Sequence, residues 1–387
     1  FIKKKYNITF VYLSNKDIEL DMDLKFIRLN LPSFFNVAKN IFFHLLFLRN
    51  MSLQNCLFYS DTIFQKLKRL NLSEKYDIIF CESIRTAPYY NVSNSAFKII
   101  DLGDLISRRY KLLRNSKIKV NNVLGQFNDG SSWINRLLRI YLIQKAVLFI
   151  EEKLVKRIEE KCTNYFDSII LVSKYEQSLL NHYSKKRNVY WIPNIDLNRI
   201  NNDPKFSQNK IIAFYGILNN PHNEHSLIYF FDNIFSHLIH KDDNIKFIIM
   251  GKNPTKRIEQ YESKFPKNVI LKGYVSNIES NIKDSNLVIV PMLVGSGVKT
   301  KVLDCLSWGV PVVSTREGVS GVVNIEESGV LVYDDTDSFI NGILKIINDK
   351  NFAHICSEKS FKYYNKYYSQ GSIESKYDDA FNNMELI

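Results

Sequence analysis

A glycine-rich turn between Val294 and Thr315 is the part of the sequence whose residue types point most directly to chemistry. Gly295, Ser296 and Gly297 follow a run of apolar residues and precede a segment with helical spacing. Glycines let the backbone approach a ligand closely, and the start of a helix offers free N–H groups and the positive end of the helix dipole. The turn therefore predicts a site for an anion such as a diphosphate.

Two lysines and one aspartate extend this site into the helix. Lys299 and Lys301 fall in its first turn, where a positive side chain is unfavourable unless an anion lies nearby. A diphosphate would remove this conflict, and local conflicts of this kind are typical of functional sites. Asp304, about one turn further on, could accept hydrogen bonds from ribose hydroxyls. The alternative is an ordinary strand, turn and helix with two lysines on the surface.

Buried strands that end in glycine surround this turn in the C-terminal half. Three short apolar runs are each followed by a glycine: Ile211–Tyr215 by Gly216, Lys246–Met250 by Gly251 and Val269–Lys272 by Gly273. Helical patterns separate the strands, which predicts βαβ units and a parallel sheet covered on both faces. Because ligands of open α/β sheets lie beyond the carboxyl ends of the strands, we expect these glycines to line the same site.

The N-terminal half shows the same alternation less regularly. Its strand candidates are Asn7–Leu13, Lys25–Leu29, Asp77–Cys81, Phe97–Asp101, Ser168–Val172 and Asn188–Ile192, with a long helical region from Trp133 to Cys162. We therefore expect an α/β protein of two facing Rossmann-like domains, residues 1–195 and 196–370. For the tail, residues 371–387, packing back on the N-terminal domain is one option. Because the chain starts at Phe1 with the end of a helical pattern, we expect the first domain to lack its first strand and helix.

The segment around the glycine-rich turn resembles the signature of the group 1 glycosyltransferases, a family with the GT-B fold. The matching residues are Gly295, Ser296, Gly297, Lys299, Lys301, Leu303, Asp304, Gly309, Pro311, Val312 and Val313. Other stretches resemble the family in order: F-Y-G-I-L-N-N-P-H-N from Phe214, I-I-M-G-K up to Lys252, L-K-G-Y-V-S-N from Leu271, and W-I-P-N-I-D from Trp191. The resemblance covers about Trp191–Ser369 well.

This resemblance implies a retaining glycosyltransferase that moves a sugar from a nucleotide-diphosphate sugar to a saccharide or lipid-linked saccharide, in cell-surface polysaccharide synthesis. It implies base contacts near Tyr274 and Val275, diphosphate contacts from Lys299 and Lys301, and a ribose contact from Asp304. The implied donor-binding residues are Gly216, Gly251, Gly273, Tyr274, Val275, Gly295, Ser296, Gly297 and Asp304. No cofactor or bound metal is implied, and the seven histidines form no metal-binding pattern.

Three departures from the family pattern keep other functions open. The usual ribose-binding Glu is replaced by Asp304, and Ser296 stands where many relatives carry a further Glu. Ile217 and His222 stand about where many relatives have Arg and Lys. A catalytically inactive nucleotide-sugar-binding module and a sugar-nucleotide epimerase of the same fold therefore remain alternatives.

The N-terminal half carries a weaker resemblance at Lys98–Tyr110, K-I-I-D-L-G-D-L-I-S-R-R-Y, which is similar to the family's D-x-x-D-x-x-S segment. In relatives this region faces the cleft between the domains. The resemblance makes Asp101 and Asp104 candidate catalytic residues that could orient a hydroxyl or support a cationic intermediate. The alternative is a polar strand end, with Asp104 as the N-cap of the next helix.

Excess positive charge is confined to the first half of the chain. Residues 1–200 contain 32 Lys and Arg against 18 Asp and Glu, and the rest is close to neutral. An anionic membrane surface would suit this charge, nucleic acid lacks a supporting motif, and ordinary solvated surface is the alternative. Five isolated cysteines and the absence of a signal peptide or a long apolar run indicate a cytoplasmic protein, with the inner face of the cell membrane as its candidate surface.

Two stretches could contact such a membrane. Phe34–Arg49 places aromatic and aliphatic side chains around a helix that also contains Lys39, and Arg108–Lys119 contributes a series of basic residues. Basic residues between apolar ones suit the membrane interface. For Phe34–Arg49, the alternative is a helix packed on its own sheet.

Overall fold

The computed structural model describes residues 5–15, 24–115, 141–194, 210–293 and 298–381. The chain forms two compact units: unit 1 comprises Phe1–Val172, Glu176–Ile192 and Glu374–Ile387, and unit 2 comprises Ser173–Tyr175 and Pro193–Ile373. The main division between the two units lies between Ile192 and Pro193.

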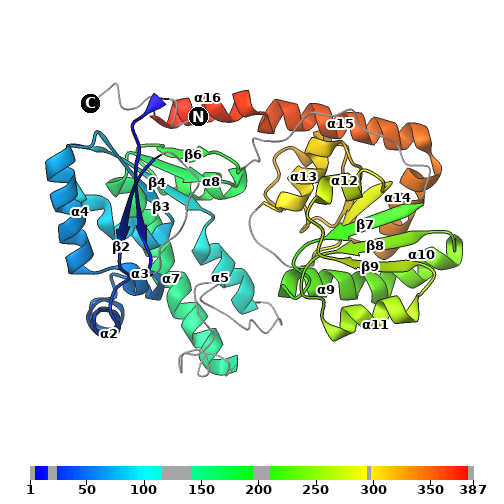
Figure 1. The fold of residues 1–387 in the computed structure, drawn as a ribbon, viewed down its shortest axis with the longest axis horizontal. Coiled ribbons are helices and arrows are strands. Elements are labelled where there is room, and N and C mark those ends of the chain that lie inside the picture. The colour runs from blue at the N-terminus through cyan, green and yellow to red at the C-terminus, as the bar shows by residue number, and fades with distance from the viewer. Residues whose placement is uncertain (1–4, 16–23, 116–140, 195–209, 294–297, 382–387) are drawn as a thin grey trace. The chain divides into compact units, whose positions relative to one another are not determined.

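Unit 2 is built on one six-stranded parallel sheet with the order β12-β11-β10-β7-β8-β9. Its strands are β7 (Ile211–Tyr215), β8 (Lys246–Met250), β9 (Val269–Gly273), β10 (Leu287–Val290), β11 (Val312–Ser314) and β12 (Leu331–Val332). Helices lie on both sides of this sheet (Figure 1). The central strands are buried because their side chains face a helical layer on either side.

The helices of unit 2 follow the strands as the periodicity predicts. They are α9 (Pro221–Phe230), α10 (Ser236–Lys241), α11 (Lys256–Lys264), α12 (Ile278–Ile282), α13 (Thr300–Trp308), α14 (Thr336–Asn348) and α15 (Lys350–Tyr368), with a short 3₁₀ turn η5 (Ile325–Glu327). The helical segment from α9 to α10 is interrupted by a π-helical turn, η4 (Phe231–Phe235). Around this turn the core is aromatic, with Phe230, Phe235 and Phe247 fully buried against one another.

Unit 1 contains two parallel sheets. A pair of strands, β1 (Thr9–Leu13) and β2 (Lys25–Leu29), accompanies a four-stranded sheet of β3 (Ile78–Glu82), β4 (Phe97–Gly103), β5 (Ser168–Leu171) and β6 (Val189–Trp191), in that order. Its helices are α2 (Phe34–Asn40), α3 (Leu53–Phe58), α4 (Asp61–Glu74), α5 (Ile106–Asn115), α7 (Tyr141–Tyr165) and α8 (Lys174–Asn181), with a π-helical turn η1 (Ile41–Phe47) and a 3₁₀ segment η2 (Ile84–Val92). The predicted α/β class is confirmed.

The C-terminal segment is helical rather than a polar tail. Helix α16 (Gln370–Phe381) contacts unit 1 through several kinds of interaction. The Ser168 hydroxyl donates to the carbonyl of Ala380 at 2.5 Å, and Lys5 pairs with Asp378 at 2.6 Å. Phe381 contributes a ring contact with Tyr6. A chain segment distant in sequence therefore completes unit 1.

The apolar helix near the N-terminus is not packed on its sheet. The segment α2–η1, residues Phe34–Phe47, leaves most of its large apolar side chains in solvent, and η1 has no buried residue. Phe42 and Leu46 are each 62% exposed and Phe47 is 77% exposed. The core alternative for this stretch is therefore wrong. Within the described parts of the chain, no helix has the length and hydropathy needed to cross a membrane.

Candidate functional site

The carboxyl edge of the unit 2 sheet brings three of the predicted glycines onto neighbouring strands. The N–H of Gly216 after β7 donates to the Met250 carbonyl at 3.0 Å, and the N–H of Gly251 after β8 donates to the Gly273 carbonyl at 2.7 Å. A Cβ at Gly251 would lie only 1.8 Å from the Gly216 carbonyl oxygen. Only glycine fits there, because the two loops approach so closely.

The strand order puts a crevice beside these glycines. β7 and β10 are neighbours, while the chain continues from β7 toward β9 and from β10 toward β12. Such a reversal leaves an open space at the carboxyl ends of the two strands, where ligands of doubly wound sheets bind. The loop after β7 and the first turn of α13 lie beside this switch point, which we call the β7–β10 crevice. Gly295, Ser296 and Gly297 lie outside the described residues.

Both predicted lysines lie at the start of α13. Lys299 is the N-cap residue, and its ammonium lies 3.4 Å from the Ser320 hydroxyl. Lys301 lies in the first turn, with Nζ 2.9 Å from Oδ1 of Asn223 and 4.1 Å from the centre of the Phe214 ring. Two positive side chains at the positive end of a helix are suited to a negatively charged ligand, and their role in donor binding stays a prediction.

Burial makes the charge of Lys301 sensitive to its surroundings. It lowers the pKa of Lys301 to about 7, and the nearby Lys299 acts in the same direction, while Cys305 and Asp304 oppose the shift. No ion pair joins Lys301 to a carboxylate in the described part of unit 2. An anion beside Nζ would therefore favour the protonated, charged form.

Asp304 is held by the last residue of β7. The Tyr215 hydroxyl lies 3.0 Å from Oδ2 of Asp304 and 3.0 Å from the carbonyl of Lys301. Burial raises the pKa of Tyr215 well above its ordinary value, so the hydroxyl stays protonated and remains a donor. Asp304 is partly exposed, and its role as a ribose contact stays a prediction.

The residues predicted to lie near the base follow β9. Tyr274 is 65% exposed, and the ammonium of Lys252 lies 4.2 Å from the centre of its ring. Val275 is half-buried. An exposed aromatic ring beside the glycine edge could pack against a planar base.

The two predicted catalytic carboxylates lie in unit 1, within and after β4. Asp101 accepts the N–H of Gly103 at 2.8 Å, and burial raises its pKa. Asp104 forms a two-pronged ion pair with Arg109. Asp101 is partly buried. Because Asp101 accepts from Gly103 and Asp104 pairs with Arg109, both carboxylates have partners within their own loop and helix.

Two buried glutamates that the sequence did not indicate hold this loop. Glu159 on α7 accepts the N–H of Ser107 at 3.1 Å and also bonds its hydroxyl, while Glu176 on α8 accepts the N–H of Leu105 at 3.1 Å. Burial raises the pKa of Glu159 to about 8. The partners are 52 and 71 residues apart in sequence, so no local pattern could have revealed them.

Carboxylates from other parts of unit 1 offset some of the positive charge of the basic stretch that begins at Arg108. Three of its arginines pair with carboxylates: Arg108 with Glu176, Arg109 with Asp104 and Arg114 with Glu152. Lys117 and Lys119 lie outside the described residues. The expectation that this stretch contacts a membrane stays a prediction, and these three ion pairs reduce the net charge that its arginines would bring to it.

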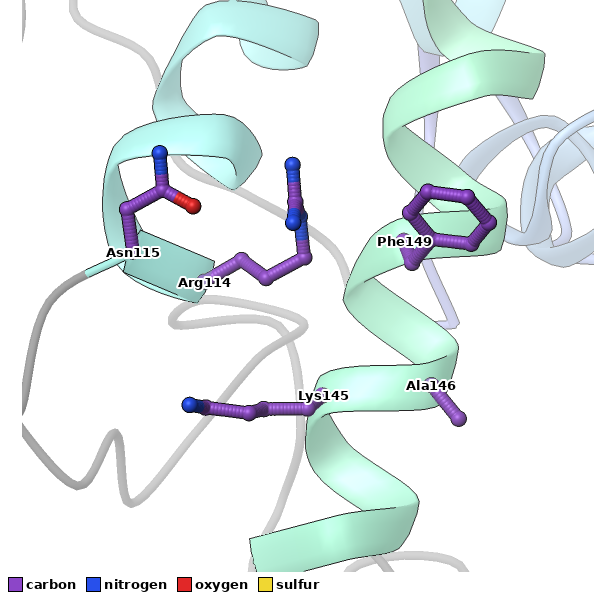
Figure 2. A pocket seen from close by; sticks show the side chains of 5 residues that line it. All are labelled: Arg114, Asn115, Lys145, Ala146 and Phe149. Atoms are coloured by element: carbon purple, nitrogen blue, oxygen red, sulfur yellow. The ribbon is translucent and has the colours of Figure 1, made fainter.

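A hollow of about 590 Å³ lies between α5 and α7. It is lined by Arg114, Asn115, Lys145, Ala146 and Phe149. Figure 2 shows the side chains of Arg114 and Lys145 extending into the space between the two helices. Among the described residues, no cluster of three or more His, Cys, Asp or Glu could hold a metal ion.

Residues 209–349 match the family described as "Glycosyl transferases group 1". The matched segment contains the whole unit 2 sheet, both lysines and Asp304. The family resemblance that the sequence motifs suggested is thereby confirmed.

Two proteins are similar in sequence to this chain, one over most of its length and one over about a quarter of it. An uncharacterised 44.6 kDa protein in the cps region of Klebsiella pneumoniae is 27% identical over 289 residues, which cover 72% of this chain and 67% of that protein. An Escherichia coli enzyme named UDP-Gal:alpha-D-GlcNAc-diphosphoundecaprenol alpha-1,3-galactosyltransferase is 31% identical over 110 residues. That alignment covers 27% of this chain and 28% of the enzyme.

Solved structures share the fold at low sequence identity. Anabaena HepE in complex with UDP has a TM-score of 0.60 and 12% identity, covering 93% of this chain and 86% of HepE. TarM has a TM-score of 0.59 and 18% identity, covering 82% of this chain, but this chain spans only 58% of TarM. The predicted GT-B fold is confirmed.

Proposed function

We propose that the chain transfers a sugar from a nucleotide-diphosphate sugar to a saccharide acceptor, because residues 209–349 match the group 1 glycosyltransferases. The observation that carries the proposal is the arrangement at the start of α13. Lys299 and Lys301 lie beside the β7–β10 crevice, and Asp304 lies one turn further along the same helix. The lysines that would bind a diphosphate and the carboxylate that would bind ribose hydroxyls therefore lie on the same helix, α13.

In the proposed mechanism the protein acts mainly through electrostatics. As the bond between the sugar and the diphosphate breaks, negative charge grows on the departing phosphate oxygens. Lys299, Lys301 and the N–H groups at the start of α13 would stabilise that charge, and preorganised charges of this kind are a major source of catalysis. We propose a retaining outcome on the family resemblance, with Asp101 and Asp104 as candidate residues on the acceptor side.

For the donor, we propose a UDP-hexose. HepE is described in complex with UDP, and the E. coli relative is named for UDP-Gal. Tyr274 and Val275 would contact the base, and Gly216, Gly251 and Gly273 would allow the nucleotide to approach the sheet edge.

For the acceptor, we propose a lipid-linked saccharide at a membrane surface. The E. coli relative is named for a diphosphoundecaprenol acceptor. The exposed apolar face of α2–η1 supports this choice, because side chains such as Phe42 and Phe47 would be buried by entering the lipid interface. Residues 31–60 contain no Asp or Glu, so nothing in this stretch would be repelled by anionic headgroups.

The hollow between α5 and α7 is a candidate subsite for the acceptor's phosphate groups (Figure 2). Lys145 supplies positive charge there beside Arg114, whose guanidinium also pairs with Glu152, and the Phe149 ring is 44% exposed. A basic hollow beside apolar surface matches an amphipathic ligand with a phosphorylated end. We propose a cytoplasmic location, peripheral on the inner face of the cell membrane, and chemistry without a bound metal or cofactor.

A panel of sugar nucleotides tests the proposed function. The full chain should bind one nucleoside diphosphate in preference to others, hydrolyse the corresponding sugar nucleotide slowly, and transfer its sugar to a lipid-linked diphosphate saccharide. Epimerised sugar nucleotide as the product would instead establish the epimerase alternative. Binding without hydrolysis, transfer or epimerisation would establish an inactive binding module, and no binding at all would refute the donor site.

A further inference from the structure

Asn223 connects the two chain segments that border the β7–β10 crevice. Its Nδ2 donates to the carbonyl of Ile217, just after β7, at 3.0 Å, and its Oδ1 accepts from the ammonium of Lys301 on α13 at 2.9 Å. The donation to Ile217 fixes the orientation of the amide, so the oxygen faces the lysine. A Cβ at Gly216 would come within 2.7 Å of Nδ2 of Asn223. Glycine at this position therefore leaves the space that the bridge occupies.

The bridge orients Lys301 without neutralising it. An amide oxygen accepts a hydrogen bond but carries no formal charge, whereas a carboxylate in the same place would form an ion pair with the ammonium. Among the described residues, no other group near Lys301 forms an ion pair with it, although Asp304 and Cys305 partly oppose the effect of burial on its pKa. Lys299 is a second cation, the Tyr215 hydroxyl is neutral, the Cys305 thiol is buried, and the Asp304 carboxylate is bonded to Tyr215 rather than paired with Lys301. Burial of the amine further disfavours its charged form in the empty site.

We infer that Asn223 is a positioning residue that holds Lys301 at the diphosphate subsite without forming an ion pair with it, so that a nucleoside diphosphate binds together with a proton taken up by the lysine. This inference rests on the proposed function, because it needs a diphosphate beside Lys301. With Asn223 as its partner, Lys301 is charged mainly when the ligand is present. With an aspartate at position 223, Lys301 would be charged and already paired.

The experiment is a calorimetric titration of the full chain with UDP, ADP and GDP at pH 7.5, in buffers of different ionisation enthalpy. The difference between buffers counts the protons taken up. With the pKa of Lys301 near 7, the unmodified chain should take up roughly three-quarters of a proton as the best ligand binds. Asn223→Asp should abolish most of that uptake and weaken binding about tenfold or more, because the new carboxylate pairs with Lys301 and repels the diphosphate.

Asn233→Asp is the matched control. Asn233 is exposed on η4 in the same unit and donates to the Tyr229 carbonyl at 3.0 Å, so this variant adds the same charge away from Lys301. It should keep both the affinity and the proton uptake. Asn223→Ala, with thermal melting as a check on folding, should weaken binding while retaining uptake.

The outcomes separate this inference from the proposed function. If UDP, ADP or GDP binds the unmodified chain, but Asn223→Asp keeps the same affinity and the same proton uptake, the role of Asn223 is refuted and the donor site stands. If the unmodified chain binds a diphosphate without proton uptake, the coupling to Lys301 is refuted. If none of the three binds, the proposed function fails and the inference fails with it.

Discussion

The hydroxyl of Tyr215 lies 3.0 Å from Oδ2 of Asp304, although the two residues are 89 positions apart in the sequence. Tyr215 is the last residue of β7 and Asp304 is in the second turn of α13, so the bond joins the two elements beside the crevice. The tyrosine is buried and cannot turn toward solvent. It therefore fixes the orientation of the Asp304 carboxylate on α13.

Asp304→Asn should weaken UDP binding by about 10- to 100-fold, because it converts a charged acceptor into a neutral one at a contact worth about 1.5–3 kcal/mol. Tyr215→Phe should weaken it only a few-fold, since about 1 kcal/mol of orientation is lost while the charge remains. Calorimetric titration gives the affinities, and thermal melting reports folding. Unchanged affinity in Asp304→Asn, with a large loss of stability, would mark the carboxylate as structural.

Lys299→Ala and Lys301→Ala should each weaken UDP binding by about 10- to 100-fold, because each removes one charge-assisted contact to the diphosphate. Lys272→Ala is the matched control, since Lys272 is an exposed lysine on β9 of the same sheet whose ammonium contacts Asn281. It should leave the affinity unchanged. Equal affinities in all three variants would show that neither predicted lysine binds the donor.

UDP binding should not depend on a divalent cation. The two lysines supply positive charge at the site, and the described residues contain no group of side chains suited to holding a metal. The measurement is the same titration with EDTA and with magnesium chloride, at constant ionic strength because salt itself screens charge. A tenfold or greater loss of affinity in EDTA would contradict metal-independent binding.

Continuous apolar runs predicted much of the fold. The bounds expected for Ile211–Tyr215 and Lys246–Met250 coincide with β7 and β8, because strands buried on both faces leave clear patterns. The glycine-rich motif likewise led to Lys299 and Lys301. Such signals are local, so they identify elements and their ends.

The partners of those residues could not be predicted, because they come from distant segments. Asn223 is 78 residues from Lys301, and neither is part of a shared periodic pattern. The exposure of α2–η1 could not be predicted either, because helical spacing of apolar residues is equally compatible with burial and with exposure. The last helix was also missed, because α16 is polar overall and its stability comes from contacts with unit 1 such as that between Ala380 and Ser168.

Glu159 should make unit 1 less stable as the pH rises. Its folded-state pKa is about 8, against 4.5 for the ordinary carboxyl, and burial is the main cause. Between these values the folded state binds more protons than the unfolded state, so the free energy of unfolding falls by up to roughly 1.4 kcal/mol per pH unit. Glu159→Gln resembles the protonated acid and should remove this slope.

Urea unfolding of Glu159→Gln and of the unmodified chain between pH 5 and pH 9 measures the effect of Glu159. The variant should be about equal in stability at the acid end and more stable at the alkaline end. Glu160→Gln is the control, because Glu160 is the neighbouring residue but lies near the surface, 3.7 Å from Lys156. If Glu159→Gln shows the same pH slope as the unmodified chain, Glu159 is ionised in the folded state.

Membrane binding should depend on the exposed side chains of α2–η1. Phe42 and Leu46 are each 62% exposed, so changing both to Ser should hardly alter the melting temperature, whereas a buried pair would cost roughly 2–5 kcal/mol for each residue. Burying either side chain in the lipid interface is worth about 1.5 kcal/mol or more, which predicts at least a tenfold loss of vesicle binding. Flotation with vesicles containing phosphatidylglycerol measures binding, and neutral phosphatidylcholine vesicles should bind less because the N-terminal half is basic.

Leu72→Ser is the control, since Leu72 is 66% exposed on α4 of the same unit but lies outside this surface. Full binding by the Phe42 and Leu46 double variant, or equal loss in Leu72→Ser, would show that α2–η1 is not the membrane-binding surface.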